Sequence, residues 1–436
     1  MTDTDQMLAA LGGPPIRTRP WPKWPRATRS THQAVAEVLD SSRWAVSGPY
    51  DGRVCFERRF AAAFAAFHGV PYCTPTTSGT AALTIALQAV GVRRGDEVLV
   101  PGLTWVACAS AVSNLGAVPI LVDCDPRTLA MSPAAAAASI SPRTVAILVV
   151  HPFCGVADLD AFQTLADLYG LALIEDCAQA HGARWRGRPV GTFGRAGCFS
   201  MQQSKLLTAG EGGAVICRDP QLYDRLEQFR ADGRRFVADP VPSRLELFEV
   251  GAVQGRNLCL SELQAAVLLD GLSRLPEENR HRAARVSELE WLVADIDGVS
   301  MLPADDRVTE RTYYNLVLRI EPARVGGATV DAVSQALSAE LGAMVNPVYV
   351  PLNRHRLYQP TTLTSGPAEP ATARLDPGRF ALPEADRARR TCLTLTQSLF
   401  LDDPAGMHDI ADALRKVQRC AADLLKLDQE ATALAF

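Results

Sequence analysis

A single lysine, Lys205, lies in the stretch Gly197–Gly213, between a strand-like approach and a glycine-rich exit. The nearest charged residues along the chain are Arg195 and Glu211. A lysine held away from water favours its neutral amine, which is the nucleophile that Schiff-base chemistry with a carbonyl needs. An ordinary loop lysine fits these residues equally well. The rest of the chain has to decide between the two interpretations.

An aspartate follows one of the predicted buried strands. The apolar run Leu171–Ile174 leads directly into Glu175 and Asp176. Ligands of parallel sheets bind beyond the carboxyl ends of the strands, so Asp176 could pair with a ring nitrogen and keep it protonated. An aspartate after a strand is more often a helix cap or a turn residue. Both interpretations stay open on this residue alone.

A short polar segment, Thr76–Thr80, precedes an apolar helix. The backbone N–H groups and hydroxyls of Ser78, Gly79 and Thr80, together with the helix dipole, would make a phosphate cradle. Serine and threonine are also the preferred capping residues, so a cap without a ligand fits the same pattern.

Further residues complete a possible cofactor site. Trp105 follows another strand and could stack on a planar ligand or belong to the core. Ser200 could add a hydroxyl to a phosphate, and glycines after Lys205 would let the backbone pass close to a ligand (Gly210, Gly212 and Gly213). A phosphate cradle, an aromatic plate, an acid and a lysine are the parts that hold pyridoxal phosphate.

The elements that position these residues alternate between strands and helices from residue 71 onward. This alternation predicts an α/β fold with a mainly parallel sheet covered by helices on both faces. The predicted strands are Glu97–Val100, Val118–Val122, Val145–Val150, Ala172–Glu175, Ala196–Ser200 and Gly213–Cys217. The predicted helices are Thr31–Ser41, Cys55–Phe67, Ala81–Val90, Trp105–Leu115, Pro133–Ile140 and Leu159–Tyr169.

Three parts are expected along the chain: an extended proline-rich arm over residues 1–30, a large domain over 31–298 and a small α+β domain over 299–436. Two helices, with Pro276 in the first turn of the second, should lead out of the large domain. They are expected at Ser261–Leu272 and Glu277–Ala294. The small domain should hold strand Tyr314–Ile320, helix Val330–Leu341, a loop at Gln359–Ala373 and a terminal helix from Met407.

Composition narrows the class of protein. The chain has 436 residues, 47% of them hydrophobic and 21% charged, with a net charge of -4, which does not favour a nucleic-acid partner. No apolar run is long enough to span a membrane. The 11 cysteines are scattered without a Cys-x-x-Cys pair, so reduced thiols in the cytoplasm and no metal site are expected.

The ordered set of motifs resembles the DegT/DnrJ/EryC1/StrS aminotransferases. The matching segments are Thr77–Thr80, Gly95–Pro101, Thr104–Trp105, Ile174–Gly182, Phe199–Lys205, Thr208–Gly213 and Gly255–Gln264. The resemblance implies an aspartate-aminotransferase-like large domain of PLP fold type I, a smaller C-terminal α+β domain and the cofactor pyridoxal 5′-phosphate.

The resemblance also assigns roles by position. Lys205 would form the Schiff base with the cofactor, Asp176 would pair with its pyridine nitrogen, and these two would be catalytic. Gln179 would lie near the phenolic oxygen, and Trp105 would stack on the ring. The phosphate-binding residues would be Ser78, Gly79, Thr80 and Ser200, with Asn257 from a neighbouring subunit, which implies a homodimer with shared sites.

The substrate is narrowed by branch-specific residues. Many nucleotide-sugar members read Asn-Tyr-Arg where this chain has Asn257-Leu-Cys259, which disfavours a sugar nucleotide. Three segments are instead similar to the aminocyclitol branch: Ser42–Gly48, Gln202–Lys205 and Thr312–Tyr314. Members of that branch transfer an amino group from L-glutamine to scyllo-inosose or 2-deoxy-scyllo-inosose in aminoglycoside pathways.

Three alternatives remain at this stage. A 3-amino-5-hydroxybenzoate synthase-like enzyme shares Ala180–Trp185 and Thr208–Gly213. A nucleotide-sugar ketone aminotransferase and a PLP-binding regulator are the others, although regulators of this type commonly lose the lysine. Tyr313, Tyr314 and Tyr349 are plausible pocket members, and Glu211 could cap a turn or line the site.

Overall fold

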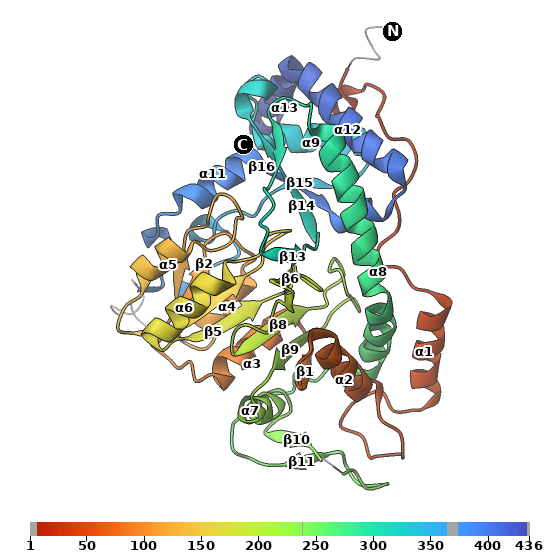
Figure 1. Cartoon of the computed structure of the whole chain (residues 1–436), viewed down its shortest axis with the longest axis vertical. Helices are drawn as coiled ribbons and strands as arrows, with labels where there is room; N and C mark the ends of the chain where they lie inside the picture. The colour runs from red at the N-terminus through yellow and green to blue at the C-terminus, as the bar shows by residue number, and fades with distance from the viewer. Residues whose placement is uncertain (1–6, 238, 364–373, 434–436) are drawn as a thin grey trace.

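A seven-stranded sheet forms the centre of the protein (Figure 1). The computed structural model describes residues 7–237, 239–363 and 374–433. The strand order is β1-β9-β8-β5-β4-β2-β3, in which β8, β5, β4, β2 and β3 are parallel and β9 is antiparallel to both of its neighbours. The strands run Tyr72–Thr76 (β1), Glu97–Pro101 (β2), Val118–Val122 (β3), Thr144–Val150 (β4), Ala172–Asp176 (β5), Ala196–Ser200 (β8) and Gly213–Cys217 (β9).

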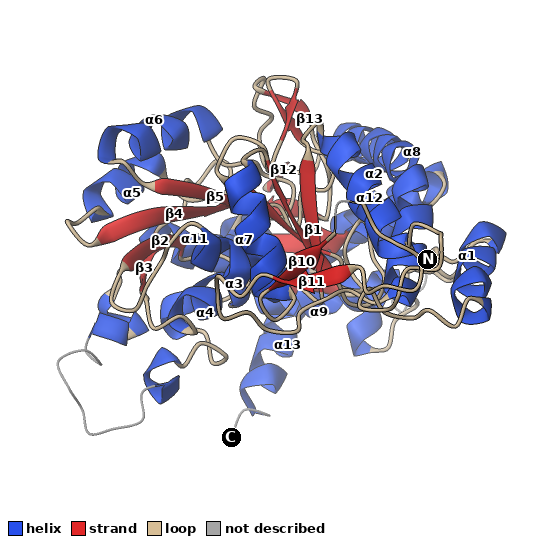
Figure 2. Ribbon diagram, turned by 90° about the horizontal axis from the view of Figure 1, so that it is seen from below, coloured by secondary structure: helices blue, strands red, loops and turns tan. Residues whose placement is uncertain are grey.

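Both faces of this sheet are covered by helices because successive strand residues point to opposite sides. Val98 and Val100 belong to one buried cluster and Leu99 to another. One face is covered by α3 (Gly79–Ala89), α4 (Ala107–Ser113) and α7 (Pro220–Arg230), and the other by α2 (Phe56–His68), α5 (Pro133–Ser139) and α6 (Leu159–Tyr169) (Figure 2). The predicted mainly parallel α/β layer is therefore confirmed.

One long helix, α8 (Glu262–Val293), stands where two helices were predicted. Pro276 lies inside it, although a proline removes one helical hydrogen bond and usually kinks or ends a helix. Leu272 and Leu275 are buried before the proline and Val286 after it, while α8 packs on α1 (Arg29–Asp40), α2 and α12 (Pro404–Arg419). This packing keeps the helix continuous, so the prediction of a break was wrong.

A second, four-stranded antiparallel sheet follows α8, in the order β12-β14-β16-β15. Its strands are Val299–Met301 (β12), Asn315–Ile320 (β14), Val345–Pro347 (β15) and Cys392–Thr396 (β16). The helices of this part are α9 (Val330–Leu341), α11 (Pro383–Thr391), α12 (Pro404–Arg419) and α13 (Ala421–Ala433). Because β12 starts at Val299, this sheet supports a division at 298/299, which remains a proposal.

Short strands complete the described structure. β6 (Arg184–Trp185) pairs with both β7 (Arg188–Pro189) and β13 (Val308–Glu310). β10 (Arg234–Phe236) pairs with β11 (Leu247–Glu249) and lies beyond α7 (Figure 1).

The N-terminal arm packs on the C-terminal part of the chain. Arg17 forms ion pairs with Asp402 and Asp409, at 2.8 and 2.7 Å, and stacks over Trp21. The indole of Trp21 donates a hydrogen bond to the carbonyl of Leu341 over 2.7 Å. A short 3-10 turn at Ala9–Leu11 interrupts an otherwise extended course. Residues 1–6 of the predicted arm and residues 364–373 of the predicted loop lie outside the described residues.

Among the described helices, none is long and apolar enough to cross a membrane.

Candidate active site

A cavity of about 530 Å³ opens where β2, β5 and β8 end and α3 begins. These strand ends share one edge of the sheet, which is where ligands of open α/β sheets bind. The predicted site residues found on its wall are Ser78, Gly79, Thr80, Trp105, Asp176, Gln179, Ser200 and Lys205. The structure thus brings together all of the predicted site residues except Asn257.

Lys205 is half-buried in this cavity wall. Its backbone N–H donates to the carbonyl of Gln202 over 2.9 Å, in the loop that follows β8. Its Nζ lies 4.1 Å from the centre of the Tyr314 ring, a cation–π distance. The expected separation from water is therefore partial: the Tyr314 ring covers the amine on one side, and the cavity is open on the other.

Asp176, the last residue of β5, is buried with its carboxylate on the cavity wall. Its Oδ1 accepts a hydrogen bond from the backbone N–H of Ala178 over 2.9 Å, so the turn interpretation is also correct. Its Oδ2 accepts a hydrogen bond from the thiol of Cys108 over 3.0 Å. Burial raises the pKa of Cys108 well above its usual value, and the negative charge of Asp176 adds to this, so the thiol keeps its proton and donates.

Cys108 was missed in the sequence, although a signal for it existed. It lies three residues after Trp105, near the start of α4, the helix that follows β2. The helix predicted over Trp105–Leu115 would place Cys108 on the same face as Trp105, because side chains three or four apart lie on the same face of a helix.

The residues predicted to hold a phosphate lie together where α3 begins. The Ser78 hydroxyl accepts a hydrogen bond from the N–H of Ala81 over 3.1 Å, so this residue caps the helix as the alternative interpretation held. A Cβ on Gly79 would lie 2.6 Å from the Cβ of Ser200. The helix terminus therefore meets the end of β8 without an intervening side chain, and Thr80 and Ser200 lie on the same cavity wall. A helix N-terminus of this kind favours an anion.

Trp105 is 47% exposed and so is not a core residue. Its ring lies 6.2 Å from that of Tyr349 and 6.2 Å from that of His355. Gln179 is buried beside it: its Oε1 accepts from the N–H of Phe153 over 2.6 Å, and its Nε2 lies 3.5 Å from the Tyr349 hydroxyl. Both residues present part of their side chain to the cavity.

Two of the three plausible pocket tyrosines, Tyr314 and Tyr349, line the cavity. Tyr313 instead packs beside Arg311, with the guanidinium carbon 5.6 Å from the ring centre. Glu211 also lines the cavity, and its backbone carbonyl accepts a hydrogen bond from Gln264 over 2.7 Å.

The close backbone approach at Gly213 serves the fold. A Cβ there would lie 2.4 Å from the carbonyl oxygen of Ser78, because β9 passes directly against the start of α3. Gly213 therefore permits a contact between two backbone segments, where a contact with a ligand was expected.

Asn257 is exposed and does not line the cavity of its own chain. It forms an isolated β-bridge with Ala231, and its Oδ1 lies 3.5 Å from the N–H of Cys259. Its assignment to a neighbouring subunit's phosphate remains a proposal.

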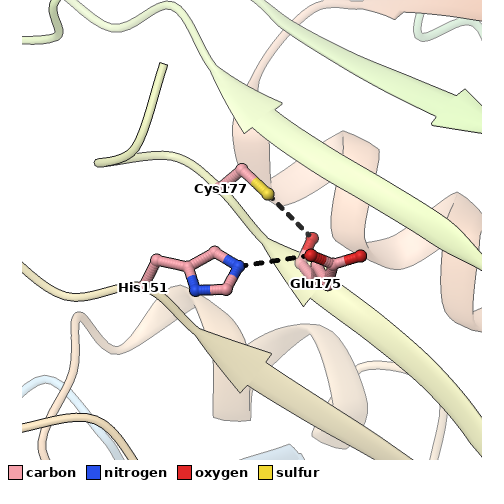
Figure 3. A group of neighbouring side chains, drawn as sticks. All are labelled: His151, Glu175 and Cys177. Carbon is pink, nitrogen blue, oxygen red and sulfur yellow. Dashed lines mark hydrogen bonds and ion pairs between the residues drawn. The ribbon is translucent and has the colours of Figure 1, made fainter. Parts of the chain in front are cut away.

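The opposite face of β5 carries a buried cluster formed by His151, Glu175 and Cys177 (Figure 3). Glu175 accepts hydrogen bonds of 2.7 Å from three backbone N–H groups, those of Gly191, Phe193 and Gly194. The N–H of Ala157 donates to Nδ1 of His151, so the proton lies on Nε2, which faces the Glu175 carboxylate at 3.4 Å. The Glu175 and His151 atoms that could bind a metal therefore already take part in hydrogen bonds. The bonds to Glu175 hold the segment after β7 against β5.

Two buried histidines lie beneath the site, around Phe199. Burial lowers the pKa of His68 to about 4 and that of His181 to about 3, and the positive charge of Lys205 contributes to the latter shift. Both rings are therefore neutral near pH 7. His181 does not line the cavity.

The fold and this cavity can be compared with known proteins. The sequence profile of the DegT/DnrJ/EryC1/StrS aminotransferase family matches residues 25–390. The chain belongs to this family. Aminotransferases of this family use pyridoxal phosphate, and the chain has their α/β fold of type I and their enzyme class, that of a transaminase.

Relatives of this DegT/DnrJ/EryC1/StrS aminotransferase match nearly its whole length. An L-glutamine:2-deoxy-scyllo-inosose aminotransferase of Streptomyces fradiae is 49% identical over 421 residues, which cover 96% of this chain and 99% of the relative. An L-glutamine:scyllo-inosose aminotransferase of Streptomyces griseus is 45% identical, with 95% and 98% covered. The solved structure of 3-amino-5-hydroxybenzoic acid synthase aligns with a TM-score of 0.77 and 30% identity over 92% of this chain and 99% of that one.

Proposed function

We propose that this aminotransferase binds pyridoxal 5′-phosphate and moves an amino group from L-glutamine to the ketone of a cyclitol, scyllo-inosose or 2-deoxy-scyllo-inosose. The observation that carries the chemistry is the meeting of Lys205, Asp176 and the start of α3 around one cavity. The acceptor and donor are supported by the relatives of Streptomyces fradiae and Streptomyces griseus, which are named for these substrates. This reaction belongs to the biosynthesis of aminocyclitol antibiotics, and the cytoplasm is the compartment expected for it.

The residues of the cavity fit the cofactor part by part. The start of α3, where Gly79 leaves no side chain between the helix and Ser200, suits a phosphate. The Asp176 carboxylate suits a protonated ring nitrogen, because its two hydrogen bonds from Ala178 and Cys108 hold it in one orientation on the cavity wall. The N–H donors of Gln179 suit the phenolic oxygen, and the exposed ring of Trp105 suits stacking on the pyridine.

The side chains of the cavity have separate roles in the proposed reaction. The cofactor, when bound, supplies a carbonyl that takes up the amino group and a ring that accepts the electrons of the substrate Cα–H bond. Lys205 Nζ, once neutral, removes the proton from Cα of the amino donor and returns it during the second half-reaction on the ketone carbon. Asp176 holds the proton at the ring nitrogen throughout. Trp105 and Tyr349, whose ring centres lie 6.2 Å apart, line the cavity side.

The charges of the wall favour an uncharged acceptor. Lys205 is the one cation among the described residues that line the cavity, which also carries the carboxylates of Asp176 and Glu211. The diphosphate of a sugar nucleotide would find no arginine on this part of the wall, whereas a polyhydroxylated ring needs none.

We also propose a homodimer in which Asn257 reaches the phosphate of the partner's site.

One assay tests the proposed function. Purified protein is mixed with L-glutamine and scyllo-inosose, and the products are analysed by mass spectrometry for an aminocyclitol. The 2-deoxy ketone is tested in parallel. Formation of neither aminocyclitol would refute the acceptor class and leave the 3-amino-5-hydroxybenzoate synthase-like and sugar-nucleotide alternatives to be tested with their own substrates.

A spectroscopic experiment tests the lysine. The purified protein should absorb in the visible through its bound cofactor, and Lys205→Ala should remove that band and the activity. The control is Lys23→Ala, which changes a lysine of the N-terminal arm and should leave the band unchanged. A Lys205→Ala protein with the wild-type band would contradict the assignment.

A further inference from the structure

The loop in front of Lys205 contains a hydrogen-bonded chain of three side chains. The Ser204 hydroxyl lies 2.7 Å from Oε1 of Gln202 and 2.9 Å from the hydroxyl of Tyr314. The backbone N–H of Ser204 also donates to the same Oε1 over 2.9 Å. All three residues line the cavity, and Tyr314 comes from the segment just before β14, far along the chain from the other two.

The backbone N–H of Ser204 determines which group donates in each hydrogen bond among Gln202, Ser204 and Tyr314. A backbone N–H can only donate, so the side-chain atom of Gln202 that faces Ser204 is its carbonyl oxygen. The Ser204 hydroxyl donates its single proton to that oxygen, because Oε1 can only accept. The hydroxyl of Tyr314 must then donate to the oxygen of Ser204.

This arrangement leaves one donor group and one acceptor atom for a ligand. The NH₂ group of Gln202 points away from Ser204 and makes no hydrogen bond with the described residues, although Gln202 lines the cavity. The phenolic oxygen of Tyr314 keeps a lone pair, since its proton is the part engaged with Ser204. A hydroxyl group is the ligand that accepts from an amide and donates to an oxygen at the same time.

We propose that Gln202 and Tyr314 bind a ring hydroxyl of the cyclitol acceptor, next to the carbon that receives the amino group. Ser204 orients both of them. The position follows from Tyr314, whose ring centre lies 4.1 Å from Nζ of Lys205, the group that serves the reacting carbon. The inference rests on the proposed function and specifies how that cavity recognises a neutral polyol.

The neighbouring glutamine provides a matched control. Gln203 is exposed and does not line the cavity, and its backbone carbonyl accepts a hydrogen bond from Trp24 over 3.1 Å. Gln202→Glu keeps an oxygen for Ser204 and loses the N–H donors, and Gln203→Glu makes the same chemical change outside the cavity. Tyr314→Phe keeps the ring over Lys205 and removes the hydroxyl.

The experiment separates the two half-reactions of the holoprotein. Loss of the visible band with increasing L-glutamine gives the apparent dissociation constant of the donor, called the donor constant. Conversion of scyllo-inosose at increasing concentration gives the acceptor KM. Gln202→Glu and Tyr314→Phe should each raise the acceptor KM about tenfold, the loss of roughly one hydrogen bond. The donor constant should stay within about twofold in both variants. Gln203→Glu should leave both constants unchanged.

A binding measurement gives a readout without turnover. Scyllo-inositol, a polyol that cannot react, is titrated into the holoproteins in a calorimeter, and its affinity should fall about tenfold in Gln202→Glu and Tyr314→Phe alone. Wild-type acceptor KM and polyol affinity in both variants would overturn the inference. If the wild-type protein converts neither ketone, the proposed function fails, and the polyol titration decides the inference by itself. Should Gln202→Glu not retain the visible band, the uncharged Gln202→Met replaces it with the same expectation.

Discussion

The thiol of Cys108 donates a hydrogen bond to Oδ2 of Asp176 across 3.0 Å, on the wall of the cavity. The second oxygen of this carboxylate is held by the N–H of Ala178, so both oxygens have a fixed donor. The thiol comes from α4 and the carboxylate from β5, so the bond links two of the elements that line the cavity. Cys108 therefore positions the acid proposed to face the cofactor's ring nitrogen.

Removal of this donor should weaken the site. We expect Cys108→Ala to lower kcat/KM about tenfold, since a hydrogen bond to a charged group contributes about 1.5 kcal/mol or more. Cys108→Ser is the matched control, because its hydroxyl can donate to the same oxygen and should restore most of the activity. Visible absorbance measured against pH checks the mechanism: its midpoint should differ from wild type in the alanine variant and return toward it in the serine variant. Equal profiles for both variants would contradict a positioning role.

The contact between Gly79 and Ser200 leads to a second prediction. A Cβ at residue 79 would lie 2.6 Å from the Cβ of Ser200, which is closer than real Cβ contacts allow, so α3 and β8 have to move apart in Gly79→Ala. We expect this variant to bind pyridoxal phosphate at least tenfold more weakly, because the proposed phosphate donors come from both elements. Equilibrium dialysis with the cofactor measures the change.

The partner residue supplies the control for this variant. Ser200→Gly removes the Cβ that a side chain at residue 79 would meet. The double variant should therefore bind the cofactor more tightly than Gly79→Ala alone, although it has lost the Ser200 hydroxyl. If the second substitution weakens binding further, the steric explanation is wrong.

The sequence predicted six of the seven strands of the large sheet because their signals are local, and it missed β1 (Tyr72–Thr76). Each predicted strand of the parallel layer is present to within one residue at either end, since short apolar runs bounded by turns are typical of strands buried on both faces. The proline signal at Pro276 failed because it too is local. Burial of Leu272, Leu275 and Val286 on both sides of the proline is a property of the folded chain, and it outweighs one lost hydrogen bond.

The cavity wall could be predicted only in part, for a related reason. Lys205, Asp176 and the start of α3 lie in motifs whose residues are neighbours in sequence, so their types and order indicated a site. Tyr314 and Cys108 reach the same wall from other segments, and their hydrogen bonds to Ser204 and Asp176 depend on how elements pack. A single sequence can indicate Tyr314 or Cys108 as a candidate for the wall, but it carries no signal for the partners of their hydrogen bonds. The assignment of Asn257 depends on a second chain and stays a prediction.

The buried histidines predict a pH dependence of stability. Burial lowers the pKa of His68 to about 4 and of His181 to about 3, whereas an unfolded chain titrates near 6.5. Between these values the unfolded chain binds more protons, so the free energy of unfolding falls as the pH drops below about 6.5. The fall approaches about 1.4 kcal/mol per pH unit for each histidine.

Urea unfolding at pH 7, 6 and 5 measures this slope. His68→Asn keeps an N–H for the carbonyl of Phe64, which His68 Nδ1 contacts at 2.9 Å, and cannot take up a proton in this range. The slope of the variant should be smaller than that of the wild type by about one histidine's share. A change of the exposed His408 to Asn should leave the slope unchanged. Equal slopes for wild type and His68→Asn would show that His68 is not neutral in the folded protein.

Glu175 gives the last prediction, because it lies next to Asp176 and points to the opposite face of β5. Its carboxylate accepts three backbone N–H groups and faces His151, and all of these partners are donors. Glu175→Gln has nearly the same shape but turns an NH₂ group toward donors. We therefore expect a loss of about 3 kcal/mol in the free energy of unfolding, measured with urea.

A control variant and the visible band decide whether Glu175 serves the fold or the chemistry of the site. Glu249→Gln, at an exposed position of β11, should change stability by less than about 0.5 kcal/mol. Where Glu175→Gln is still folded, its visible band and its constants for glutamine should stay close to wild type, because Asp176 and Lys205 lie on the other side of the strand. A variant of wild-type stability with a lost band would instead place Glu175 in the chemistry of the site. The hydrogen bonds of its carboxylate argue against that outcome, since three backbone donors and His151 already occupy it.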